Sequence, residues 1–84
     1  MSQSQTGTTF ENAIVIQAPH EGAGVAAIYR YLDRRFGVRG SRSGWELRAQ
    51  RLHEVDGRHY DEMEIAVGGE IKIVFFDIES FFGK

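Results

Sequence analysis

Two glycine-marked turns constrain the fold of this chain more than any other feature. They are Val55-Asp56-Gly57 and Val67-Gly68-Gly69, and they separate three runs in which apolar and polar residues alternate. Alternation with a period of two is the pattern of a half-buried strand, and short breaks that contain glycine are typical of hairpin loops. The C-terminal half of the chain therefore predicts a three-stranded antiparallel meander.

The hydrophobic pattern also predicts the length of each loop. A two-residue loop would divide the apolar residues of the first hairpin between two faces, which a sheet with one buried face should avoid. A three-residue loop pairs Trp45 with Val67 and Ala49 with Met63, and it places Gly57 in the left-handed position of a bulge. The same reasoning applies to the second turn. The predicted core face is Trp45, Leu47, Ala49, Met63, Ile65, Val67, Ile71, Ile73 and Phe75.

A helix is predicted over residues 21–36, where apolar residues recur at spacings of three and four. Its stripe consists of Val25, Ile28, Leu32 and Phe36. The apolar run at residues 12–18 predicts a strand beside the last strand, which is apolar on both sides and therefore central. The expected fold class is α+β, with element order β-α-β-β-β. The four-stranded sheet is mainly antiparallel in the order 2-3-4-1, with one helix on one face and a short C-terminal turn.

Composition places the chain among small globular domains. Its 84 residues allow one domain, which we assign to residues 11–84 behind a polar tail at residues 1–10 that we expect to be disordered. There is no cysteine, which excludes disulfides and cysteine zinc sites and favours a reducing compartment. Neither a signal peptide nor a membrane-spanning run is visible, so we expect a cytoplasmic protein of bacterial type.

The charge is distributed unevenly although the net charge is only −2. Residues 30–51 contain seven arginines against two carboxylates, and residues 54–70 contain six carboxylates against one arginine. The simpler interpretation is that the two segments neutralise each other across neighbouring strands. An arginine-rich surface also binds phosphate or carboxylate, and the candidate anion-binding residues are Arg34, Arg35, Arg39 and Arg42. The pI near 5.9 argues against a general nucleic-acid binder.

The predicted register brings His53, His59 and Asp77 into one row across three strands. Directly opposite residues have Cβ atoms about 4.5–5.5 Å apart. Two imidazoles and a carboxylate at this separation suit a divalent transition metal, or a histidine base that Asp77 orients. The simpler alternative is a solvated polar corner that the helix does not reach.

On the opposite face the same register predicts an apolar and aromatic patch. Its members are Leu52, Tyr60, Phe76 and Ile78. Apolar patches with a charged rim mark protein contacts. The alternative is that Phe81 and Phe82 fold back over the patch. At the start of the helix, Gly22 and Gly24 lack the spacing of a phosphate loop, so we expect them to permit a tight turn and close packing.

The residues favour a binding domain over an enzyme, because they contain no recognisable nucleophile motif. We expect a small non-enzymatic protein-interaction or homodimerising domain, with a protein partner or a second copy, no membrane and no cofactor. Two alternatives stay open. One is an anion or nucleic-acid binder that uses residues 30–51, and the other is a metal-dependent site at His53, His59 and Asp77.

Overall fold

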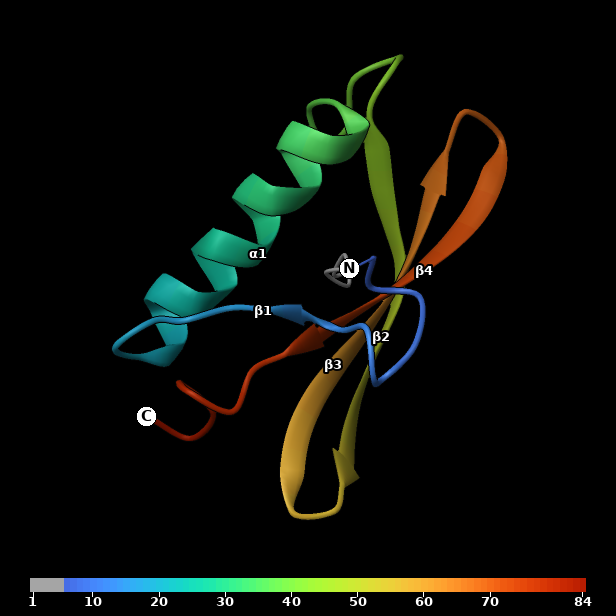
Figure 1. The fold of residues 1–84 in the computed structure, drawn as a ribbon. Coiled ribbons are helices and arrows are strands. Elements are labelled where there is room, and N and C mark those ends of the chain that lie inside the picture. The colour runs from blue at the N-terminus through green and yellow to red at the C-terminus, as the bar shows by residue number, and fades with distance from the viewer. Residues whose placement is uncertain (1–5) are drawn as a thin grey trace, which may run out of the picture.

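The structure is a computed structural model that describes residues 6–84. Its elements are β1 (Ile14–Val15), α1 (Glu21–Phe36), β2 (Trp45–Val55), β3 (Arg58–Val67) and β4 (Glu70–Asp77). The strands form one sheet in the order β1-β4-β3-β2, with α1 on one face (Figure 1). The predicted α+β class, strand order and helix bounds are confirmed. The sheet is mixed, because the short β1 runs parallel to β4.

Both loops of the meander are shorter than predicted. The first contains only Asp56 and Gly57, at φ values of 53° and 78°, and the residues on either side of it pair with each other. The second contains only Gly68 and Gly69, at φ values of 58° and 85°. Two consecutive positive φ values are the signature of type I′ turns, whose twist matches that of the flanking strands. The predicted three-residue loops are wrong, because the turn chemistry of Asp-Gly and Gly-Gly decides the loop length.

A β-bulge in β2 reconciles the short first loop with a buried Trp45. Trp45 pairs with Val67 as predicted, but the register shifts by one residue between Leu47 and Ala49. Beyond this point each residue of β2 faces a neighbour of its predicted partner, and Ala49 faces Glu64. A bulge adds one residue to one strand, so the two ends of β2 follow different registers. Ala49 consequently leaves the predicted core face.

The two-residue second loop exchanges the two faces of β4. Val74 and Phe76 are buried in the core, whereas Ile71 and Ile73 are exposed on the reverse face, the one turned away from α1. Phe75 lies on that reverse face as well. The three predicted core positions on this strand are therefore wrong. Because β4 is apolar on both sides, its hydrophobic pattern is compatible with either orientation.

The N-terminal segment covers part of the reverse face. The ring centroid of Phe10 lies 4.6 Å from that of Phe75 and 5.2 Å from that of Tyr60. The backbone N–H of Phe75 donates to the carbonyl of Gly7 over 2.7 Å. Of the predicted tail, residues 1–5 lie outside the described residues, and the remainder lies against the sheet.

The helix covers one end of the sheet much more closely than the other. Ile28 and Leu32 are buried, and the ring of Tyr29 lies edge-on to Trp45 at 5.7 Å. Asp33 Oδ1 accepts a hydrogen bond of 2.9 Å from the indole Nε1 of Trp45. Toward its first turn α1 diverges from the β2–β3 turn, which projects away from the helix (Figure 1). The apolar residues at this second end are left without a full cover.

Candidate functional site

A cavity of about 350 Å³ occupies the gap between the first turn of α1 and the sheet. Its apolar walls are Val25, Leu52, Ile78, Phe81 and Phe82. Its polar lining residues are Glu21, Gln50 and Asp61. We call this site the Asp61 cavity. Pockets of this size with apolar walls and a few convergent polar groups are the usual form of a ligand site.

Two opposing walls of the Asp61 cavity are unusually exposed for apolar side chains. Val25 on α1 is 42% exposed, and Leu52 on β2 is 55% exposed. Both belong to elements whose other ends bury their apolar residues against one another. Leu52 lies on the helix-side face of the sheet, opposite Asp61, yet α1 is too far away to cover it. The cavity is therefore bounded by apolar surface that no described residue fully shields.

Asp61 is the buried polar group of this cavity, with only 9% of its surface exposed. Gln50 Nε2 donates to its Oδ2 over 2.8 Å. Its other oxygen, Oδ1, accepts no hydrogen bond from residues 6–84. Every fully buried side-chain oxygen in that range has a partner, so Oδ1 is not fully buried. Because Asp61 lines the cavity, Oδ1 is accessible from it. Burial raises the pKa of Asp61, while the hydrogen bond from Gln50 and the charge of His53 act in the opposite direction.

The C-terminal segment forms one wall of the Asp61 cavity. Phe81 is buried against α1, where Gly24 leaves the necessary space: a Cβ at Gly24 would lie 2.5 Å from the Phe81 ring. The ring of Phe82 stacks on His59, with centroids 3.9 Å apart and an angle of 13° between the planes. The predicted close packing at Gly24 is thus confirmed, and its partner is the C-terminal turn.

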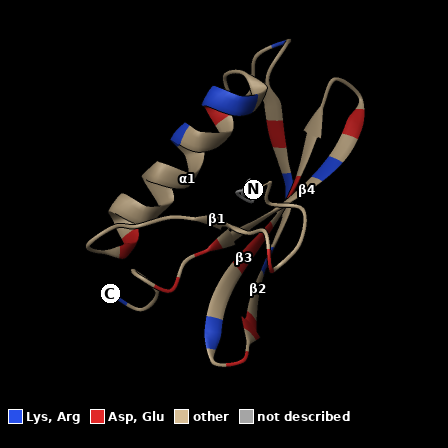
Figure 2. Ribbon diagram, in the orientation of Figure 1, with Lys and Arg blue, Asp and Glu red and all other residues tan. Residues whose placement is uncertain are grey.

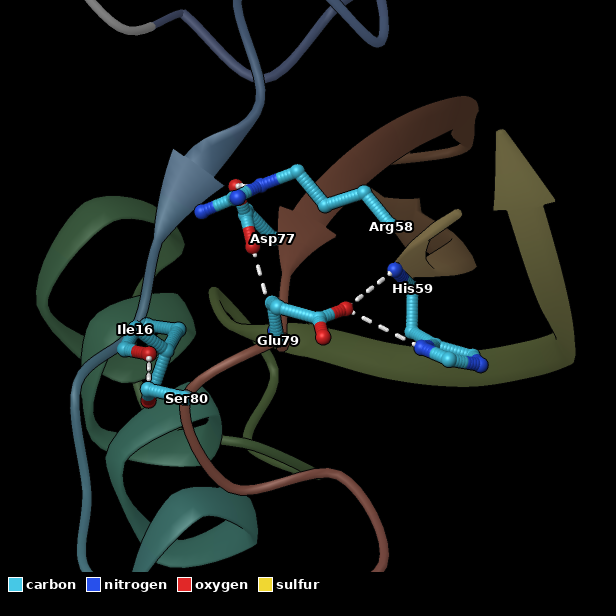
Figure 3. Close-up of polar contacts among 6 residues, drawn as sticks. All are labelled: Ile16, Arg58, His59, Asp77, Glu79 and Ser80. Atoms are coloured by element: carbon cyan, nitrogen blue, oxygen red, sulfur yellow. Dashed lines mark hydrogen bonds and ion pairs between the residues drawn. The ribbon is translucent and has the colours of Figure 1, made fainter. Parts of the chain in front are cut away.

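Polar contacts fix this wall to the sheet (Figure 3). Glu79 Oε1 accepts hydrogen bonds from the backbone N–H of His59 at 2.8 Å and from its Nδ1 at 3.0 Å. These bonds lower the pKa of the Glu79 carboxyl. The Ser80 hydroxyl donates to the Ile16 carbonyl and accepts from the Ala18 N–H. The His59–Glu79 pair therefore has a structural role: it attaches the turn that carries Phe81 and Phe82 to the sheet.

The predicted row of His53, His59 and Asp77 is not formed, because both registers differ from the prediction. His53 and Asp77 lie on the reverse face and His59 lies on the helix side. His53 Nε2 is 2.6 Å from Glu62 Oε1, and Asp77 Oδ2 accepts a 2.7 Å bond from Arg58 Nε. Within residues 6–84 no three metal-ligand side chains gather into a group.

The predicted patch of Leu52, Tyr60, Phe76 and Ile78 is divided between the two faces. Phe76 and Ile78 are buried on the helix side, and Leu52 lies exposed on that same side. Tyr60 is on the reverse face, against Phe10. Two of the four residues, Leu52 and Ile78, line the Asp61 cavity. The predicted alternative is that the C-terminal phenylalanines cover the patch. In the structure Ile78 is buried, but Leu52 stays exposed.

The four candidate anion-binding arginines have different surroundings. Arg35 Nη1 donates to the Thr6 carbonyl and the Tyr31 hydroxyl, each over 2.8 Å. Arg39 lies over the rings of Tyr29 and Trp45. Arg42 lines a polar cavity of about 320 Å³, to which Glu46 also contributes. Arg34 is exposed in the last turn of α1.

Sequence reasoning did not single out Asp61 or Gln50 as a site residue. A two-residue Asp-Gly loop would have put Leu52, and not Arg51, opposite Asp61 on the helix side of the sheet. Asp61 also occupies the apolar period of β3, two residues before the buried Met63. The Asp-Gly turn therefore indicated the correct pairing near the loop. The buried Trp45 at the other end of β2 agrees with that pairing only because of the bulge.

Comparison with known protein families, characterised proteins and solved structures finds nothing that matches this chain. Among residues 6–84 no helix is both long and apolar enough to cross a lipid bilayer.

Proposed function

We propose that this chain is a non-enzymatic protein-interaction domain whose binding site is the Asp61 cavity and the adjoining edge of β2. The observation that carries the proposal is the position of Leu52, a large apolar side chain left 55% exposed beside a cavity on the core side of the sheet. Exposed apolar surface next to a cavity is typical of contact sites. The cytoplasmic location expected from the composition belongs to this proposal.

The occupant that we propose is an extended segment of a partner protein. β2 is the end strand of the sheet, and within residues 6–84 the backbone hydrogen bond to its outer edge runs from the Gly40 N–H to the Trp45 carbonyl, at the far end. Antiparallel ladders alternate, and the two-residue loop therefore turns the backbone groups of Gln50, Leu52 and Glu54 away from β3. An added strand here would gain main-chain hydrogen bonds.

Strand addition also explains how the partner would reach the cavity. Alternate side chains of a strand point to the same face, so a segment paired with Leu52 directs every second side chain toward Val25 and the cavity. The bulge between Leu47 and Ala49 restricts such pairing to the part of β2 beyond it. Edge strands use bulges and charges in this way to prevent indiscriminate association.

The test is a selection of linear peptides from a random displayed library on the native domain, followed by affinity measurement and NMR mapping. We expect peptides that perturb Val25, Leu52 and Phe82. Leu52→Ser should weaken their binding about tenfold, as for a central apolar anchor. Ile71→Ser is the matched control, because Ile71 is 52% exposed on the reverse face, and it should leave the affinity unchanged.

Two outcomes would contradict the proposal. In the first, the selected peptides perturb Ile71 and Ile73 rather than Leu52, which would move the binding surface to the reverse face. In the second, the free domain dimerises in sedimentation and Leu52→Ser abolishes the dimer. The occupant would then be a second copy of the chain.

A further inference from the structure

We propose that the Asp61 carboxylate selects a basic side chain, a lysine ammonium or an arginine guanidinium, in the segment that enters the Asp61 cavity. This inference rests on the proposed function and adds the chemical class of the ligand. A cation on an apolar stem matches the two components of the site, which are the apolar walls and the carboxylate oxygen.

The hydrogen bonding of Asp61 is incomplete. The side chain is nine-tenths buried, Gln50 supplies the one hydrogen bond to Oδ2, and Oδ1 is open to the cavity. Burying a carboxylate is costly unless it is paired and hydrogen-bonded. A ligand that donates to Oδ1 would complete this shell, and a charged donor forms the strongest bond to a carboxylate.

The charge of the cavity lining distinguishes between an anionic and a cationic ligand. The ionisable side chains of the Asp61 cavity are Glu21 and Asp61, and within the described residues no lysine, arginine or histidine lines it. The basic residues of α1 are Arg30, Arg34 and Arg35, which all lie in the C-terminal half of the helix, away from its first turn (Figure 2). The positive end of the helix dipole favours anions at the first turn, but Glu21 occupies that turn. The balance of charge at the cavity therefore favours a cation.

The walls of the cavity suit a long aliphatic stem. Val25, Leu52 and Phe82 surround the route to Asp61 with apolar surface. Lysine and arginine carry long methylene stems that pack along such surface while the charged group reaches a polar partner. A short polar donor would leave these walls solvated, and a purely apolar side chain would leave Oδ1 without a partner.

The test uses two small probes of nearly equal size, butylammonium chloride and neutral butanol, each titrated into the native domain and followed by NMR. We expect butylammonium to perturb the amides of Leu52 and Asp61 and to bind more tightly than butanol. Asp61→Asn should weaken butylammonium about tenfold, the loss typical of a charged hydrogen bond, and should leave butanol unchanged. Glu64→Gln is the matched control, because it removes the same charge from the reverse face of the same strand.

A pH series on the native domain gives a second measurement that needs no variant. The other titratable groups around the carboxyl are Glu21 from α1, His53 from β2, and His59 with its partner Glu79. Butylammonium affinity should fall as protonation neutralises Asp61 in the acidic range, and Glu64→Gln should show the same fall.

Equal binding of butylammonium and butanol, or an equal loss in Asp61→Asn and Glu64→Gln, would overturn the inference. The proposed function fails separately. If the selected peptides bind at Leu52 but show no preference for lysine or arginine, the groove is correct and the role of Asp61 is wrong. If no peptide binds at Leu52, the proposed function itself is wrong.

Discussion

The two ends of α1 meet the same sheet in opposite ways. At the C-terminal end, Trp45 is fully buried beneath the helix, with Tyr29 against its ring and Asp33 bonded to its indole N–H. At the N-terminal end, Val25 and Leu52 face a cavity, and a carboxylate lies at its base. At the first end the buried indole N–H has a hydrogen-bond partner and the apolar residues around it are covered. The second leaves apolar surface and a carboxylate oxygen for something else to cover.

This difference indicates that one end of the domain provides most of its stability and the other end provides the proposed binding site. Closely packed apolar groups and paired polar groups stabilise the fold, and the Trp45 end has both. A partly open cavity with a buried charge contributes less to stability, and perturbed ionisable groups in clefts are concentrated at functional sites. The following measurements test that division.

The largest expected effect is the loss of the indole at the closed end. Trp45→Ala should lower the free energy of unfolding by about 3–5 kcal/mol, the usual range for a buried tryptophan. Leu52→Ala at the open end should cost less than about 1 kcal/mol, because more than half of that side chain is already in water. Denaturant unfolding followed by circular dichroism measures both. Similar losses for the two variants would show that the cavity end belongs to the stabilising core.

A smaller effect is expected where the helix contacts the C-terminal turn. Gly24→Ala introduces a methyl group 2.5 Å from the Phe81 ring and should cost about 2 kcal/mol, as overpacking usually does. It should also displace the ring resonances of Phe81 in NMR spectra. The matched control is Gly22→Ala, whose methyl group would lie 3.5 Å from the His20 ring. That variant should be neutral or stabilising by up to about 1 kcal/mol, so equal destabilisation by both would contradict the proposed contact.

The smallest expected effect is a gain in stability when the charge of Asp61 is removed. Burial raises the pKa of Asp61 in the folded protein, so its ionisation lowers stability as the pH rises through that pKa. Asp61→Asn keeps an oxygen for Gln50 and removes the charge. It should stabilise the domain by on the order of 1 kcal/mol at neutral pH, and the gain should vanish at a pH below the ordinary pKa of aspartic acid. Thermal unfolding over a pH series measures this, and destabilisation at neutral pH would mean that the charge is already fully compensated.

The elements themselves could be predicted from local sequence. The stripe of Ile28 and Leu32 gives the helix bounds, and the alternation on either side of Asp56-Gly57 and Gly68-Gly69 gives the meander. The order of the strands follows from β4, whose two apolar faces require a central position. These features depend on backbone preferences and on the period of the apolar residues. Both act over a few residues and can be read from the sequence.

The pairing of residues could not be predicted by the same means. Loop length and hydrophobic pattern gave opposite answers for the first hairpin, and the conflict is resolved by a bulge between Leu47 and Ala49. That bulge lets Trp45 remain buried beside Asp33 while Asp56 and Gly57 keep their preferred turn. The contacts that bury Trp45 come from Tyr29 and Asp33 of the helix, which are remote in sequence from β2, so a local rule cannot predict the bulge.

The chain by itself therefore determined the number, type and order of its secondary-structure elements, together with the turn chemistry that joins them. Only the tertiary structure decided which side chains share a face, and with that the separation of His53 from His59 and the placing of Leu52 and Asp61 at one cavity. The physical reason is the two-residue period of a strand, because one added residue reverses the facing of all that follow. The packing of the whole domain selects where that residue is added.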